Sequence, residues 1–485
     1  MSDTKPLRPI PDDPNAFVDL ASLTPESEGE PASEAAWTMH EPFPTTLIGL
    51  WPEVTPPDVE AITRAFAVFV GEPVAVIEDL PPQDDAICFS RVLSVPGLPA
   101  PVIVWAEPAR HIDPAELPDP ALASARWVVG CESLLSVNNP LDDFIALVRL
   151  LAGSIPALPA VLDAMTRQWF LAGELLSLFL ADEPTATEEV LWRIHAIGRS
   201  AEIGEDDRVW LYTVGLWRCG KPELEMLELP GRHVSAGVTL LNGIAALAVA
   251  GPVPSPDAVA VVGQNLRVRF RPWREVVPFL DPASVGSLAD RSAAAEDGAP
   301  NPLMGVRAVL CDAEPKGTYR KIWTWPERAI AELEGDRAAI YLSDRSTLQN
   351  ARIARSTWPL FAEAWMRVTQ LDAAMRVADI GPPSFLVKAA FEHELERERG
   401  REHLWFEVLS IDHEGAAEAT LINDPQIATQ LHEGDRVRID PREVSDWRVL
   451  LPETVLGPRT ASLLDGAIEG YRAAVMRSDR PRPGP

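Results

Sequence analysis

The chain is poor in lysine and cysteine, and the small number of cysteines limits the metal sites that it can form. Of the 43 basic side chains in 485 residues, only five are lysines. The cysteines Cys88, Cys131, Cys219 and Cys311 lie far apart, with no C-x-x-C pair and no Cys/His spacing that would close a zinc tetrahedron. We therefore expect reduced, buried thiols, no metal centre and no cofactor.

Signatures of known catalytic apparatus are also missing from the sequence. It contains no G-x-S-x-G elbow, no H-E-x-x-H, no G-x-x-x-x-G-K-[ST] and no G-x-G-x-x-G. Such motifs place a nucleophile, a metal or a phosphate on a defined turn or helix. Their absence favours a protein that does not catalyse a reaction by one of these known arrangements.

Positive charge is scarce relative to negative charge. The formal net charge is −29 and the pI is about 4.7. No basic stripe interrupts this surplus, so a phosphate backbone would be repelled. We expect no nucleic-acid partner.

The start of the chain lacks a basic segment followed by an apolar run, so no secretory signal is expected. The longest apolar stretches begin at Val238 and Asp143. The first is shorter than the ~20 residues of a bilayer span, and the second contains charges and prolines. Both favour buried helices, and the prediction is a cytoplasmic protein that does not enter the membrane.

Proline and charge clusters divide the chain. Residues 1–36 and 472–485 have too few large apolar groups to offset the entropy of ordering, which predicts disorder. Residues 281–302 are small, polar and bounded by prolines, as in a linker or long loop. The predicted folded parts are an α+β region at 37–280, with a possible split near 155, a small α/β unit at 303–378 and a β-rich domain at 379–460.

The fold class follows from the order of the expected elements. Short β-rich runs separated by proline and glycine turns mostly follow one another without crossover helices, which favours antiparallel or mixed sheets. A helix is expected from Pro140, because Asn139 precedes a proline at the first helical position. The prediction is an α+β protein of mixed or antiparallel sheets with packed helices and a small β-rich C-terminal domain.

Two clusters of charged residues each have two possible roles. Glu223 and Glu225 alternate in one expected strand, where they would either accept a basic partner or keep an edge strand soluble. Arg352 and Arg355 lie near the start of an expected helix. They favour a solvated helix face over a phosphate cradle, because no glycine-rich loop accompanies them.

The segment from Phe385 to Val449 contains a VK start, an E-H-hydrophobe-W motif, an N-D-P turn, a G-D-x-V strand and a closing S-D-W, formed by Val387, Lys388, Glu402, His403, Trp405, Asn423, Asp424, Pro425, Gly434, Asp435, Val437, Ser445, Asp446 and Trp447. With these spaced residues the segment resembles a family of bacterial domains of unknown function, the YegJ-like domain. A weaker resemblance, to an uncharacterised bacterial α+β region often found before this domain, lies at Thr213, Gly215, Gly220, Glu223 and Glu225. Neither resemblance implies a reaction.

Side chains of the expected strand that begins at His403 alternate between the two faces of the strand. Leu404, Phe406 and Val408 would face the core, which leaves His403, Trp405 and Glu407 together on the opposite surface. An aromatic side chain beside ionisable groups could hold a ligand or a partner; alternatively, Trp405 packs under a neighbouring helix. The complete set of candidate ligand-binding or partner-binding residues is His403, Trp405, Glu407, Asn423, Asp424, Asp446 and Trp447.

The polar candidates have a structural alternative. Asn423 and Asp424 have the composition of a tight turn, and Ser445 and Asp446 that of a turn leading into a strand in which Trp447 is buried. A hydrolytic interpretation takes His403 as general base with Ser445 as nucleophile or Asp446 as partner. His393, His403, His413 and Asp446 are the available metal ligands, but their spacings do not favour coordination.

The sequence thus favours an uncharacterised cytosolic bacterial protein that binds a protein or a small ligand without catalysis. Its negative charge would suit a role in stress or in toxin immunity. A hydrolase that uses His403 with Asp446 or Ser445 is the alternative.

Overall fold

The computed structural model describes residues 37, 43–81, 87–182, 184–200, 202–256, 258–263, 266–293, 302–317, 322–335, 344–370, 383–395, 398–422, 425, 430–452 and 454–478. These residues form two compact units, one within 18–341 and one within 342–485. Of the two segments expected to be disordered, 1–36 and the end of the tail lie outside the described residues. The tail was expected to begin at 472, but the last helix continues to Ser478.

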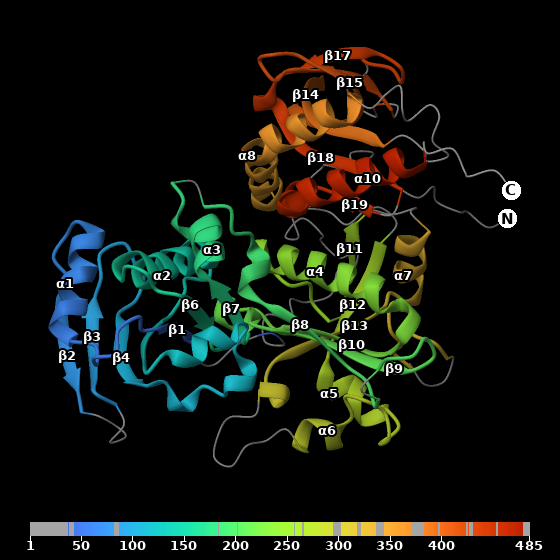
Figure 1. The fold of residues 1–485 in the computed structure, drawn as a ribbon. Coiled ribbons are helices and arrows are strands. Elements are labelled where there is room, and N and C mark those ends of the chain that lie inside the picture. Colours follow the sequence, from blue (N-terminus) through green and yellow to red (C-terminus); the bar gives the residue numbers. More distant parts are fainter. Residues whose placement is uncertain are drawn as a thin grey trace, which may run out of the picture. The chain divides into compact units, whose positions relative to one another are not determined.

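The first unit begins with a seven-stranded antiparallel sheet in the order β2-β3-β4-β5-β1-β6-β7 (Figure 1). Its strands are β1 (Thr45–Leu50), β2 (Ala75–Leu80), β3 (Phe89–Ser94), β4 (Val102–Pro108), β5 (Trp127–Ser133), β6 (Ala160–Asp163) and β7 (Gln168–Leu171).

Helices α1 (Val59–Val70) and α2 (Pro140–Ser154) pack on this sheet and on each other. Asp58 caps α1 by accepting the amide of Glu60, and Gly71 ends the helix in the left-handed conformation. Helix α2 begins at Pro140 after Asn139, as the sequence predicts. The short helix α3 (Ala172–Glu174) follows β7.

A second sheet of six strands completes this unit, in the order β11-β12-β13-β10-β9-β8. Its strands are β8 (Arg193–Ile197), β9 (Arg208–Val214), β10 (Glu223–Pro230), β11 (Val259–Gly263), β12 (Leu266–Pro272) and β13 (Arg307–Asp312). Strand β13 pairs with β10 in parallel, and the other pairs are antiparallel. One hydrophobic cluster joins the two sheets into a single core.

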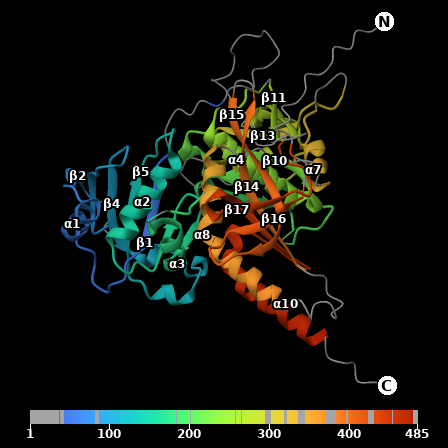
Figure 2. The same ribbon diagram turned by 90° about the horizontal axis from the view of Figure 1, so that it is seen from above.

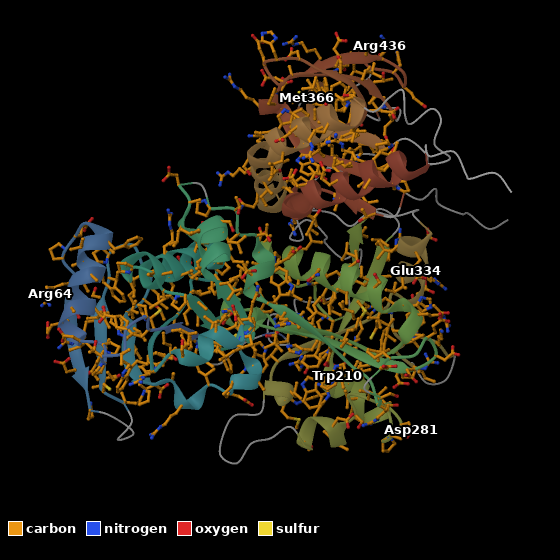
Figure 3. All side chains as sticks on the ribbon, viewed as in Figure 1. Arg64, Trp210, Asp281, Glu334, Met366 and Arg436 are labelled. Carbon is orange, nitrogen blue, oxygen red and sulfur yellow. The ribbon has the colours of Figure 1, made fainter. Side chains whose placement is uncertain are left out.

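Helices cover both faces of the second sheet. Helices α4 (Val234–Ala250) and α7 (Glu327–Glu334) lie over one face, while α5 (Trp273–Val276) and α6 (Leu288–Ala293) lie near the other. Trp210, labelled in Figure 3, belongs to a hydrophobic cluster on that second side, which also contains Trp273. The stretch Gly231–Ala250, within the described residues, is long and apolar enough to cross a membrane by length and composition alone. Its Leu240 and Ile244 belong to the core of this unit.

Two sequence segments have a different place in the second sheet and its helices than the sequence predicts. Strand β13 and helix α7 were expected in a separate α/β unit at 303–378, but both belong to this unit, and β13 pairs with β10 and β12 inside the sheet. The last helix expected in that α/β unit, which begins at Asp344, belongs to the other unit. The expected linker at 281–302 contains α6, whose Arg291 is fully buried. Arg291 is therefore held in the interior of this unit.

The second unit contains a six-stranded antiparallel sheet in the order β17-β16-β15-β14-β18-β19. Its strands are β14 (Ser384–Leu395), β15 (Glu398–Ile411), β16 (Ala417–Leu421), β17 (Arg436–Ile439), β18 (Val444–Leu451) and β19 (Thr454–Leu456). Helices α8 (Asp344–Thr369) and α10 (Leu464–Ser478) pack with the apolar side of this sheet in one core (Figure 2). The predicted α+β class, with a β-rich C-terminal part, is confirmed.

Candidate functional site

Strand β15 has the two faces that its sequence predicts. Leu404, Phe406 and Val408 are buried beneath α8 and α10, whereas His403 and Trp405 are partly exposed and Glu407 is exposed. Side chains of paired residues in neighbouring strands lie on the same side of a sheet. The far side of this sheet therefore carries a second row of residues from β14 and β18.

Register identifies the neighbours of Trp405. Lys388 of β14 pairs with Trp405 on one side and with Asp446 of β18 on the other. We call the surface formed by Lys388, His403, Trp405, Glu407 and Asp446 the distal face, because the described helices of this unit pack on the opposite side of the sheet.

The distal face joins a cation, an indole and a carboxylate. The Lys388 ammonium lies 5.7 Å from the centre of the Trp405 ring. Burial lowers the pKa of Lys388, and the charge of Arg448 lowers it further, while the charge of Asp446 opposes both. Burial raises the pKa of Asp446 although Arg448 and Lys388 favour its ionised form.

His403 and Ser445 meet beside this cluster. The Nδ1 atom of His403 lies 2.7 Å from Oγ of Ser445, which also lies 3.2 Å from the carbonyl oxygen of Lys388. The contact depends on a β-bulge: Lys388 pairs with Asp446 and Ala389 with Val444, so Ser445 is left between two pairs. Ala390 pairs with His403 and has only a methyl side chain. This small group leaves room for the contact between His403 and Ser445.

Asp446 does not join this pair. One of its carboxylate oxygens accepts the amide of Trp447 at 2.8 Å, and the other lies 3.2 Å from a guanidinium nitrogen of Arg448. Glu402 is buried on the opposite side of β15. The structure therefore brings His403 to Ser445, and orients Asp446 toward Arg448.

Three of the sequence candidates do not contribute to the distal face as described. Trp447 is fully buried: its indole N–H donates to Oγ1 of Thr357 at 3.1 Å and its ring packs on Phe361, so it holds α8 to the sheet. Asn423 and Asp424 lie outside the described residues. Sequence analysis did not select Lys388 as a site residue, although its alternation with the buried Val387 and Ala389 was a usable signal.

The acidic pair of β10 requires a correction. Glu223 and Glu225 were expected to accept a basic partner or to protect an edge strand, but both are buried on a strand that lies between β9 and β13. Glu223 accepts the Thr213 hydroxyl at 2.6 Å and the Gly215 amide at 2.7 Å. Glu225 binds Arg291 and Arg307 inside the protein. These carboxylates organise the interior of the second sheet.

The remaining expectations concern thiols, metals and arginines. Cys131, Cys219 and Cys311 are buried as expected, whereas Cys88 is exposed. Among the residues that the structure describes, no group of three or more His, Cys, Asp or Glu side chains is placed to hold a metal ion. Arg355 donates to the backbone oxygen of Val444, so it holds α8 to β18.

Two segments of the chain are similar to uncharacterised protein families. Residues 194–301 match a family model described as the C-terminal part of a protein of unknown function (DUF4026). Residues 347–473 match one described as an uncharacterized protein conserved in bacteria (DUF2314), and they include the whole distal face. No curated protein and no solved structure matches the chain. Both segments are thus similar to domains of unknown function, and the YegJ-like name remains a prediction.

Proposed function

We propose that this protein binds a ligand or a partner protein through the distal face, without catalysing a reaction. The observation that carries the proposal is the position of Trp405, which is partly exposed on the side of the sheet opposite α8 and α10 and lies against Lys388. A rigid aromatic surface beside charged groups is a common centre of binding energy.

The test compares proteins recovered from a bacterial lysate by wild type, Trp405→Ala and Leu348→Ala. Leu348 is a suitable control because it is 63% exposed on α8, away from the distal face. We expect a bound partner or ligand to be lost with Trp405→Ala and retained with Leu348→Ala. A ligand that is retained equally by all three proteins would place the binding surface elsewhere.

A cytoplasmic role in stress or in toxin immunity is the proposed setting, and the charge of −29 supports it because an acidic protein attracts basic partners. Such a partner would bind less tightly as salt concentration rises, since screening weakens attraction between exposed charges. Measuring the retained partner across a salt series tests this role separately from the choice of surface.

One observation favours a second candidate, a hydrolase. The 2.7 Å contact between His403 and Ser445 has the separation that a base and a nucleophilic hydroxyl need. Against it, the Ser445 hydroxyl is also within hydrogen-bond distance of the Lys388 carbonyl, and Asp446 does not orient the imidazole. A fluorophosphonate probe and a panel of esters, phosphates and glycosides test this candidate. Labelling or turnover that persists in both Ser445→Ala and His403→Ala would end it.

A further inference from the structure

Lys388 differs from the other lysines that the structure describes. The Lys221 ammonium donates to the backbone oxygen of Gly251 at 2.5 Å, and the Lys316 ammonium pairs with Glu327 at 2.7 Å. Within the described residues, the Lys388 ammonium has no hydrogen-bond acceptor or ion-pair partner. The Lys388 ammonium lies 5.7 Å from the centre of the Trp405 ring.

The carboxylate nearest in register to Lys388 is already engaged. Asp446 lies directly across the strand pair, yet its two oxygens are taken by the Trp447 amide and the Arg448 guanidinium. Arg448 itself adds a second positive charge near the amine. A lysine that is desolvated and close to another cation is the arrangement that activates an amine as a nucleophile.

The surroundings of Lys388 lower the pKa of its amine. Burial is the largest cause lowering the pKa of Lys388, and Asp446 opposes it only by its charge. The indole ring favours the ammonium form, but at 5.7 Å the cation is close to the ~6 Å limit for this interaction. Burial therefore decides the direction in which the pKa of Lys388 shifts.

We propose that Lys388 is a carbonyl-reactive amine, and that the ligand of the distal face is a small molecule carrying an aldehyde next to an aromatic or apolar group. The inference rests on the proposed binding function and specifies its ligand class. The apolar group of the ligand packs on Trp405, and the Lys388 amine forms a covalent bond to the aldehyde carbon.

The reaction balances without an oxidant or reductant. The lone pair of the neutral amine attacks the aldehyde carbon, the new C–N bond forms, and the carbonyl π electrons move to oxygen. Transfer of a proton gives a carbinolamine. The carbinolamine then loses its hydroxyl together with the remaining N–H proton as one water molecule, and the nitrogen lone pair forms the C=N bond of a neutral imine. The bond is reversible by hydrolysis.

Reductive labelling of the full chain tests this directly. Wild-type protein is treated near neutral pH with naphthaldehyde and cyanoborohydride, which reduces only imines that have formed, and initial labelling rates at individual lysines are measured by peptide mass spectrometry. We expect Lys388 to be labelled several-fold faster than Lys316 and Lys221. Equal or slower labelling of Lys388 overturns the proposal, and this arm requires no variant to fold.

Two variants then test whether the labelling rate of Lys388 depends on the charges around its amine or only on its accessibility. Asp446→Asn removes the charge that favours the ammonium, so labelling of Lys388 should rise. Arg448→Gln removes a repelling cation and frees Asp446, so labelling should fall. The same direction of change in both variants would overturn the electrostatic argument.

Trp405 is tested by comparing two aldehydes. Trp405→Ala should slow labelling of Lys388 by naphthaldehyde several-fold relative to formaldehyde, which has no apolar group. An unchanged ratio would exclude Trp405 as the platform. If Lys388 is unreactive while a natural ligand is still lost with Trp405→Ala, the proposed function stands and this inference alone fails.

Discussion

Glu225 and Arg291 form a fully buried ion pair in the interior of the first unit. One guanidinium nitrogen of Arg291 lies 3.0 and 2.9 Å from the two carboxylate oxygens of Glu225, and both side chains are 0% exposed. The guanidinium also lies 4.8 and 4.9 Å from the ring centres of Trp210 and Trp273. Arg307 adds a contact to Glu225 at 3.3 Å.

Glu225→Gln should therefore destabilise this unit severely. It leaves two buried guanidinium groups facing a neutral amide, and breaking one side of a buried ion pair costs about 3–5 kcal/mol. The measurement is the free energy of unfolding from urea titration. Glu205→Gln, at an exposed position, should change it by less than about 0.5 kcal/mol. Similar losses for the two variants would show that Glu225 contributes little.

Asp163 and Arg218 join the first sheet to the second. Their side chains are 0% exposed, with nitrogen–oxygen distances of 2.6 and 3.1 Å, and Arg218 also donates to the Leu191 carbonyl. Asp163→Ala should cost about 3–5 kcal/mol for the same physical reason. The exposed pair of Asp206 and Arg232, 3.0 Å apart, is the matched control, and Asp206→Ala should cost at most about 1 kcal/mol. Thermal unfolding that ranks the two variants the other way would contradict this assignment.

The sequence carried enough local information to predict the α+β class and the two faces of β15. Alternation in β15 depends only on neighbouring residues, because successive side chains of a strand point to opposite sides. The start of α2 at Pro140 is equally local, since a proline lacks only an amide that the first helical turn leaves unpaired.

The position of β10 could not be predicted in the same way. Glu223 and Glu225 alternate like the exposed residues of an edge strand, and their partners are distant in sequence, with Arg291 lying 66 residues after Glu225. The polar composition of 281–302 likewise hides the residue that completes this ion pair. On the distal face, the contact between His403 and Ser445 requires a bulge in a strand pair, which no single-strand pattern reveals.

The lowered pKa of His195 predicts that the stability of the folded protein depends on pH. Its ring stacks on Tyr212 with centroids 5.2 Å apart, and burial together with the charges of Arg193 and Arg307 lowers the pKa of His195 below its ordinary value of 6.5. The unfolded chain then binds the proton more readily than the folded protein, so stability is lost as the pH falls below about 6.5. His195→Phe keeps a stacking ring without the titration. Unfolding free energies measured from pH 8 to pH 5 should fall less steeply for this variant, and parallel profiles would exclude His195 as the source.

Alanine substitutions at Gly215 and Gly97 distinguish the cost of backbone strain from the cost of steric overlap. Both have positive φ, at 129° and 85°. A methyl group at Gly97 would meet no atom within 4 Å, whereas at Gly215 it would lie 2.1 Å from the Leu191 carbonyl oxygen, the same oxygen that accepts from Arg218. Gly97→Ala should therefore cost only the strain of the left-handed region, about 1–3 kcal/mol. Gly215→Ala should cost more, because it must also move backbone at the junction that Asp163 and Arg218 hold. Equal losses of unfolding free energy would mean that this close backbone approach relaxes freely, and that the junction is looser than its hydrogen bonds indicate.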